Sequence, residues 1–200
     1  MLAASRTHGS SRSSHLSDDA LVEALEVSQR LGMLGRRPIR DVIDHARAFV
    51  DALSTTTGTV VDLGSGGGVP GLVIAVDRPD LDVVLVERRQ TRADHLVRLV
   101  SRLELTNRVS VRAVDAARLH EALQPVEAVV ARSFGGSDVT LRAAVPLLTP
   151  GGRIVVSEPP EQDASRWPPP LLERYRLERV THPDRRVVVL RDVSRETDNA

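Results

Sequence analysis

The sequence predicts an α/β fold: a doubly wound, mostly parallel sheet, preceded by a short N-terminal helical segment and ending in an antiparallel pair of strands. From residue 59 onward, short apolar runs alternate with helical patterns, which is typical of parallel strands joined by helices. The last two extended runs are instead joined by a short turn at residues 182–184, which predicts a hairpin. With 200 residues and 41% hydrophobic content, the chain suits one domain with a substantial core.

The N-terminal part of the chain differs from this alternating pattern. Residues 1–16 are polar and serine-rich, so we expect a disordered leader there. Ser17 is a suitable N-cap for a helix through Leu31, and a second helix should follow Pro38 because its apolar residues keep helical spacing. We therefore assign residues 17–54 to N-terminal helices and residues 55–200 to the main domain.

The main domain divides into the following expected elements. Strands are expected at residues 59–63, 82–87, 109–114, 127–131 and 153–157, with helices at 70–77, 91–104, 116–123 and 137–148. The hairpin strands are expected at 175–181 and 185–192. In a sheet of this kind, ligands bind beyond the carboxyl ends of the strands.

Composition limits the functional classes. The chain has no cysteine, which excludes disulfides and thiolate metal sites and fits a reducing cytoplasm, and no apolar run reaches membrane-spanning length. We expect a cytoplasmic monomer with no metal and no membrane partner. The 27 basic residues, all arginine, balance 27 acidic residues. Because phosphate neutralisation supplies much of the affinity for nucleic acids, any RNA site must be a local arginine patch.

The glycine-rich loop after the first strand can be interpreted in two ways. Gly66-x-Gly68-x-x-Gly71 matches a dinucleotide fingerprint, with Glu87 near the position of its ribose-binding acid. The strand ends near Leu63, however, so the glycines of this match come too late for the first turn. A motif that starts earlier, with Asp62 as the acid at the end of the strand, fits better. The loop is then Gly64-x-Gly66-x-Gly68, with Ser65 between its first two glycines, and resembles motif I of class I S-adenosylmethionine-dependent methyltransferases.

That resemblance implies a cofactor site. In the methyltransferase family, the acid and the loop backbone hold the amino-acid end of S-adenosylmethionine, and an acid after the second strand binds the ribose hydroxyls. Asp62 and Glu87 occupy these positions. Asp115, after the third strand, suits the adenine amino group or is simply the N-cap of the next helix. Arg132 ends an apolar strand and needs an anionic partner.

A closer resemblance covers residues 40 to 157. The chain is similar to the RsmG (GidB) family of guanine-N7 methyltransferases acting on 16S ribosomal RNA, through Asp62-Leu-Gly-Ser-Gly-Gly-Gly-Val-Pro-Gly71, Arg78-Pro79-Asp80, Leu85-Val-Glu87, Ala131-Arg-Ser-Phe134 and Leu147-Leu-Thr-Pro-Gly-Gly152. The resemblance implies that S-adenosylmethionine contacts Gly64, Val69, the Asp115-Ala116 pair and Arg132. The chain departs from the family after the fifth strand, where Glu158 stands in place of lysine.

The implied reaction explains why no catalytic residue is evident. Guanine N7 is an acceptor with a free lone pair, so no proton has to be removed before it attacks the methyl group. Two alternatives stay open: a methyltransferase of the same fold acting on a small molecule or protein, and a non-catalytic cofactor-binding relative. An arginine cluster at one pocket mouth would favour RNA; the candidates are Arg36, Arg37, Arg40, Arg88, Arg89 and Arg92.

Overall fold

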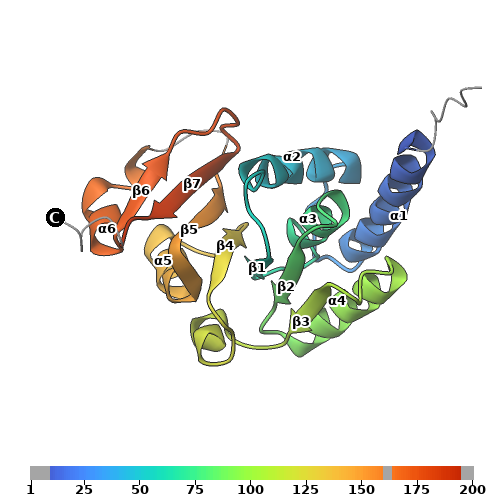
Figure 1. Ribbon diagram of the computed structural model, residues 1–200. Helices are drawn as coiled ribbons and strands as arrows, with labels where there is room; N and C mark the ends of the chain where they lie inside the picture. Colours follow the sequence, from blue (N-terminus) through green and yellow to red (C-terminus); the bar gives the residue numbers. More distant parts are fainter. Residues whose placement is uncertain (1–9, 160–163, 195–200) are drawn as a thin grey trace, which may run out of the picture.

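The computed structural model describes residues 10–159 and 164–194 and contains a seven-stranded sheet (Figure 1). The strand order is β3-β2-β1-β4-β5-β7-β6. The first five strands run parallel, and β7 pairs antiparallel with both β5 and β6. The predicted doubly wound sheet with a terminal antiparallel pair is confirmed.

The strands and helices lie close to the expected positions. The strands are β1 Thr59–Leu63, β2 Asp82–Val86, β3 Val109–Arg112, β4 Val126–Ala131, β5 Leu148–Ser157, β6 Leu177–Val180 and β7 Val187–Asp192. The α-helices are α1 Ser10–Arg30, α2 Ile39–Ala52, α3 Gly71–Asp77, α4 Gln90–Arg102, α5 Ser137–Ala144 and α6 Pro169–Arg174. Short 3-10 helices are η1 Ala116–Glu121, η2 Val145–Leu147 and η3 Ala164–Arg166.

Helices cover both faces of the sheet, and each face has its own hydrophobic cluster. Helices α1 to α4 pack on one face around side chains such as Phe49, Leu72 and Leu96. Helix α5 and the short helices η1 and η2 pack on the other, around Leu119 and Leu141. Successive residues of β1 alternate between the two clusters, because side chains alternate across a strand. The continuous apolar runs in the sequence follow from burial on both sides.

The N-terminal helices are anchored to the sheet layer. Helix α1 begins at Ser10, before the expected start at Ser17, and residues 1–9 of the expected leader lie outside the described residues. A buried hydrogen bond of 2.8 Å joins Ser28 Oγ of α1 to His95 Nε2 of α4. The segment between α1 and α2 packs on the glycine loop so closely that a Cβ on Gly67 would lie 2.7 Å from Leu34 Cγ.

Some local structure differs from the sequence patterns. The expected helix at 116–123 is the 3-10 helix η1, and the expected helix at 137–148 is divided into α5 and η2, where Pro146 removes a backbone donor. Helices η3 and α6 were not predicted. Trp167, between them, is only 4% exposed and packs on the sheet, so this segment is part of the core.

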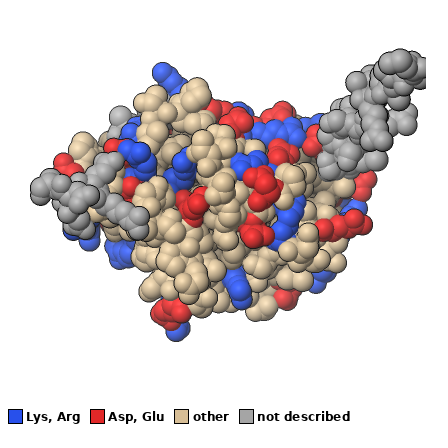
Figure 2. All heavy atoms as spheres, viewed as in Figure 1, with Lys and Arg blue, Asp and Glu red and all other residues tan. Residues whose placement is uncertain are grey.

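The described residues offer neither a membrane-spanning helix nor a cluster of metal-binding side chains. No helix in residues 10–159 and 164–194 is both long and apolar enough to cross a bilayer. The same residues bring together no group of three or more histidine or acidic side chains suited to a metal ion. Acidic and basic side chains intermingle on the face that Figure 2 shows, as the balanced formal charge would suggest.

Candidate cofactor site

The glycine loop after β1 has the geometry of the earlier of the two sequence interpretations. Gly64, Gly66 and Gly68 have φ angles of 71°, 53° and 99°, in the region that side chains disfavour. Gly71 is instead the first residue of α3. The loop therefore turns at alternate glycines and ends at the helix. This local geometry agrees with the motif that starts at Asp62.

Ser65 holds the loop to the neighbouring strand. Its hydroxyl donates to the backbone oxygen of Asp62 at 2.9 Å and accepts from the backbone N–H of Val86 at 3.1 Å. Its own N–H donates to the oxygen of Val86. Both hydroxyl functions are thus used inside the protein, so the side chain of Ser65 positions the loop.

Asp62 is completely buried at the end of β1, on the sheet face that α3 covers. Its Oδ2 accepts the backbone N–H of Gly71 at 3.1 Å, whereas its Oδ1 has no hydrogen-bond partner among the described residues. Burial raises the pKa of Asp62 to about 7, although Ser65, the N–H of Gly71 and the guanidinium of Arg132 act in the opposite direction. An unpaired buried carboxylate oxygen is costly and indicates a missing cationic or donor partner.

Arg132 follows β4, the strand beside β1. Its Nη1 is buried without a hydrogen-bond partner. Burial lowers the pKa of Arg132, the charge of Asp62 opposes that shift, and Arg37 adds to it. The sequence predicted that Arg132 needs an anionic partner, and this buried donor has none among the described residues. An anionic group from outside could complete it.

The order of the strands reverses between β1 and β4, because β1 is followed along the chain by β2 on its other side. Leu63 of β1 pairs with Ala131 of β4 at this point. Asp62 and Arg132 therefore flank the topological switch of the sheet, the place where open α/β sheets bind ligands.

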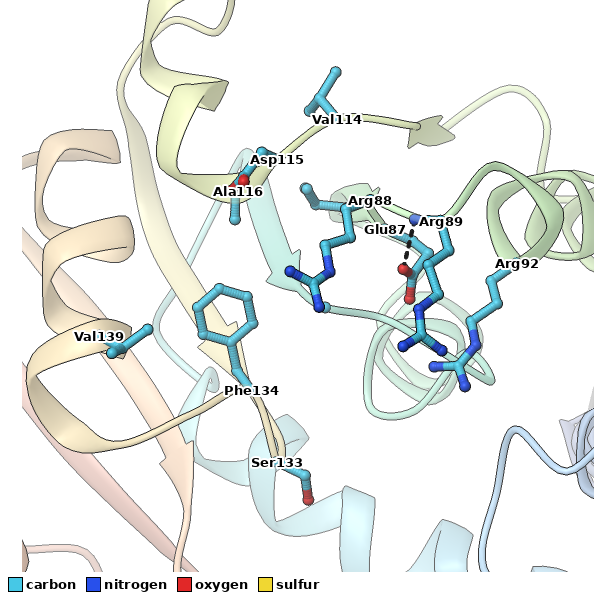
Figure 3. Close-up of a pocket in the computed structure, with 12 residues that line it drawn as sticks. Glu87, Arg88, Arg89, Arg92, Val114, Asp115, Ala116, Ser133, Phe134 and Val139 are labelled. Carbon is cyan, nitrogen blue, oxygen red and sulfur yellow. Dashed lines mark hydrogen bonds between the residues drawn. The ribbon is translucent and has the colours of Figure 1, made fainter.

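A cavity of about 450 Å³ opens beyond the carboxyl ends of β1, β2 and β3 (Figure 3). Glu87, Asp115, Ala116 and Gly64 all line it. Glu87 is 6% exposed, and its Oε1 accepts the backbone N–H of Arg89 at 2.8 Å, drawn as the dashed line in Figure 3. Asp115 Oδ1 accepts the N–H of Ala117 at 3.0 Å. Asp115 thus caps η1, as one reading of the sequence expected, and also faces the cavity.

The remaining predicted residues lie outside the lining of this cavity. Gly66 and Gly68 form the turn behind it, and Asp62 and Arg132 lie at the switch point. Val69 is 5% exposed and packs in the core, so only its backbone could meet a ligand.

Apolar walls of the cavity were not identified as site residues from the sequence. Phe134 packs so close to Gly64 that a Cβ there would lie 2.8 Å from the ring atom Cδ2. In Figure 3 the Phe134 ring lies between Val139 and the acidic side of the cavity, and Val86 and Val114 complete its apolar lining. One signal was available: Phe134 is one of only two phenylalanines and directly follows a strand end.

Half of the arginine candidates gather at this cavity. Arg88, Arg89 and Arg92 line it, and Figure 3 shows their guanidinium groups beside Glu87. Arg37 lines a different cavity, and Arg40 pairs with Asp19 at 3.0 Å. These arginines are thus divided between sites and do not form the single cluster at one pocket mouth that would have favoured RNA.

The donor set fits S-adenosylmethionine. Its amino-acid end carries an ammonium and a carboxylate, and the site offers one buried unpaired carboxylate oxygen on Asp62 and one buried unpaired N–H group on Arg132. Its nucleoside end is a flat base on a ribose, and the cavity offers the acid Glu87, the phenyl ring of Phe134 and the Asp115-Ala116 segment. The site thus offers a counter-charge for each charged group of the amino-acid end, and an acid and an aromatic ring for the nucleoside end.

The sheet order together with a glycine loop at the switch point defines the class I methyltransferase fold. Solved structures agree: an O-methyltransferase family protein from Burkholderia thailandensis matches 88% of the chain and 68% of its own length, with a TM-score of 0.59 at 16% identity. A precorrin-6y C5,15-methyltransferase from Geobacter metallireducens matches 72% of the chain and 84% of its own length, with a TM-score of 0.53 at 16% identity.

Within this class, the chain belongs to the GidB family, rRNA small subunit methyltransferase G, whose model matches residues 24–162. Ribosomal RNA small subunit methyltransferase G of Salinispora arenicola is 47% identical over 102 residues, which is 48% of this chain and 42% of the relative. The Beutenbergia cavernae protein of the same name is 36% identical over 141 residues, or 66% of this chain and 63% of the relative. The chain thus aligns with less than two thirds of these relatives.

Proposed function

We propose that this protein is an S-adenosylmethionine-dependent methyltransferase that modifies small-subunit ribosomal RNA, with guanine N7 as the acceptor atom. One observation carries the proposal: the unpaired Oδ1 of Asp62 and the unpaired Nη1 of Arg132 flank the switch point of a class I methyltransferase sheet. Membership of the GidB family supports ribosomal RNA as the acceptor. Such an acceptor would place the activity in the cytoplasm.

Each residue has a defined part in this proposal. Asp62 would accept a hydrogen bond from the cofactor ammonium, and Arg132 would bind the cofactor carboxylate. Both the buried Oδ1 of Asp62 and the buried Nη1 of Arg132 would then have a partner. Glu87 would accept hydrogen bonds from the ribose hydroxyls, while Asp115 and Ala116 would contact the adenine. The cofactor supplies an activated methyl group. Because guanine N7 attacks without losing a proton, the protein needs to align the two partners and exclude water, and a general base is unnecessary.

The structure weakens one argument for a different acceptor. Glu158 follows β5 at a position where the family has lysine, so an exposed Glu158 would place negative charge at the carboxyl edge of the sheet and disfavour an RNA acceptor. It is 6% exposed, and its Oε1 accepts hydrogen bonds from Arg166 Nη1 at 2.9 Å and Trp167 Nε1 at 2.8 Å. Its charge is compensated inside the protein, so it does not repel RNA as an exposed carboxylate would.

Two measurements test the proposal. Calorimetric titration with S-adenosylmethionine and separately with NAD identifies the cofactor. Methyl transfer to small ribosomal subunits that lack the modification, followed by mapping of the methylated base, identifies the acceptor. Binding and transfer to guanine N7 are expected. Binding without transfer would move the function to another acceptor or to cofactor sensing, and binding of NAD alone would overturn the cofactor assignment.

A further inference from the structure

A second cavity, of about 550 Å³, lies on the α2 side of the same sheet edge. Its lining includes Arg37 before α2, His45 within α2, Glu158 after β5, and Asp184 and Arg186 from the turn before β7. Figure 1 shows α2 beside this turn, and Arg186 Nη1 donates to the backbone oxygen of Asp44 at 2.7 Å. The cavity therefore has walls from three separate segments held together by hydrogen bonds.

Arg132 connects this cavity to the cofactor site. Its guanidinium acts electrostatically on Asp62 on one side and on His45 on the other. The cofactor cavity lies beyond the ends of β1 to β4, whereas the second cavity lies beyond β5 and the start of β7. A methyl donor bound through Asp62 and Arg132 would thus have the second cavity on the side away from the cofactor cavity. The acceptor has to enter on that side.

The acids in this cavity are already neutralised. Asp184 accepts from Arg186 through both of its oxygens, with Nε at 3.0 Å from Oδ1 and 2.9 Å from Oδ2. Glu158 is paired with Arg166. These two ion pairs account for both acids among the described residues that line the cavity.

One arginine of the described cavity lining has no acidic partner. Arg37 is exposed and, among the described residues, forms no ion pair and donates no side-chain hydrogen bond. Burial lowers the pKa of His45, and the charges of Arg132, Arg186 and Arg37 lower it further, against a smaller opposing effect of Asp184. The lowered pKa favours the neutral imidazole at pH 7, and Arg37 and Arg186 line the cavity together with His45. A neutral imidazole here adds hydrogen-bonding capacity without more repulsion.

We propose that the cavity between α2 and the β6–β7 turn binds a phosphodiester group of the RNA acceptor, with Arg37 as its principal free charge. The inference rests on the proposed function, because it assigns the acceptor side of the same site. Guanidinium groups pair bidentately with phosphate oxygens. An anchor at this place would hold the strand that carries the target base on the far side of the methyl donor.

The test uses Arg37→Ala, with Arg40→Ala as the matched control. Both remove one exposed arginine near the start of α2, but Arg40 lies outside this cavity and pairs with Asp19. Binding to small-subunit RNA is measured as a function of salt, alongside the KM for methyl transfer and calorimetric binding of S-adenosylmethionine. Arg37→Ala should weaken RNA binding about tenfold and flatten the slope of log affinity against log salt by about 0.7, with cofactor affinity unchanged.

The outcomes separate this inference from the proposed function. If the wild-type protein methylates RNA but Arg37→Ala behaves as Arg40→Ala does, the phosphate site is wrong and the function stands. If the wild-type protein binds RNA without transferring methyl groups, the function is wrong, and the difference in salt slope between the two variants still decides the phosphate site. Absence of RNA binding by the wild-type protein overturns both.

Discussion

Asp62 and Arg132 end neighbouring parallel strands, and each keeps one buried polar atom without a hydrogen-bond partner. The two groups have opposite charges and lie at the switch point of the sheet. Burying unpaired polar atoms costs free energy, so this arrangement is costly to the protein alone and suited to a ligand that carries both charges. S-adenosylmethionine, with its ammonium and carboxylate, is such a ligand.

The raised pKa of Asp62 makes cofactor binding depend on pH. The cofactor ammonium pairs with the ionised carboxylate, and the carboxyl is increasingly protonated below its pKa of about 7. The dissociation constant for S-adenosylmethionine should therefore rise about tenfold per pH unit below that value, with release of a proton on binding. Calorimetry in buffers of different ionisation enthalpy measures both effects. In Asp62→Asn the affinity should be lower and this dependence absent; a wild-type affinity that is constant through pH 7 would contradict the prediction.

The same group should influence stability without cofactor. Asp62 ionises near 3.8 in the unfolded chain and near 7 in the folded protein. The folded state thus holds an extra proton between these values, and the free energy of unfolding falls as pH rises through this window. The full loss is at most about 4 kcal/mol, since one pKa unit corresponds to about 1.4 kcal/mol. Urea denaturation across the window should show a shallower pH dependence for Asp62→Asn. Parallel curves would mean that Asp62 titrates normally.

Glu87→Ala should weaken cofactor binding by about 1.5 to 3 kcal/mol, the usual scale for hydrogen bonds to a charged group. Glu121→Ala, which removes an exposed acid on η1 outside the cavity, is the control. Because Glu87 also accepts the N–H of Arg89, thermal unfolding is measured alongside calorimetry. Unchanged cofactor affinity in a folded Glu87→Ala protein would remove Glu87 from the site.

Gly71→Ala tests the packing that orients Asp62. A Cβ at Gly71 would lie 2.3 Å from Leu85 Cδ2 and 2.6 Å from Asp62 Oδ2, so the carboxylate or the helix has to move. We expect a loss of about 1 to 3 kcal/mol in unfolding free energy, as is usual for overpacking, together with weaker cofactor binding. Gly35→Ala is the matched control, because a Cβ there meets nothing within 4 Å. Equal behaviour of the two variants would show that the contact at Gly71 is easily relieved.

Local patterns predicted most of the fold. The strands of the sheet and the helices α2, α3 and α4 lie within a few residues of their expected positions, because periodic apolar residues report burial directly. Helix α6 and the buried Trp167 were missed, since a run of prolines gives no periodic signal and the segment is held by tertiary contacts, α6 against β6 and Trp167 against Glu158. The split between α5 and η2 follows from Pro146 in a helical pattern.

The individual roles within the site were less predictable. Asp115 was interpretable as a cap or as a ligand-binding acid, and its geometry allows both. Ser65 was predicted to bind the cofactor as part of the motif, yet its hydroxyl makes hydrogen bonds to the backbone of both β1 and β2. The sequence predicted an anionic partner for Arg132 without saying where it comes from, and among the described residues one buried donor of this side chain has none. Each of these outcomes depends on contacts between segments far apart in the chain.

The sequence by itself determined the order of strands and helices, the position of the glycine loop and the acids that end β1 and β2. These are local properties: alternation, glycine where φ is positive, and charged residues after apolar runs. Only the tertiary structure decided that Asp62 and Arg132 share a buried switch point, that Glu158 is neutralised by Arg166, and that Arg37 and His45 share a second cavity. Burial and charge compensation depend on which segments pack together in three dimensions, and no local pattern records that.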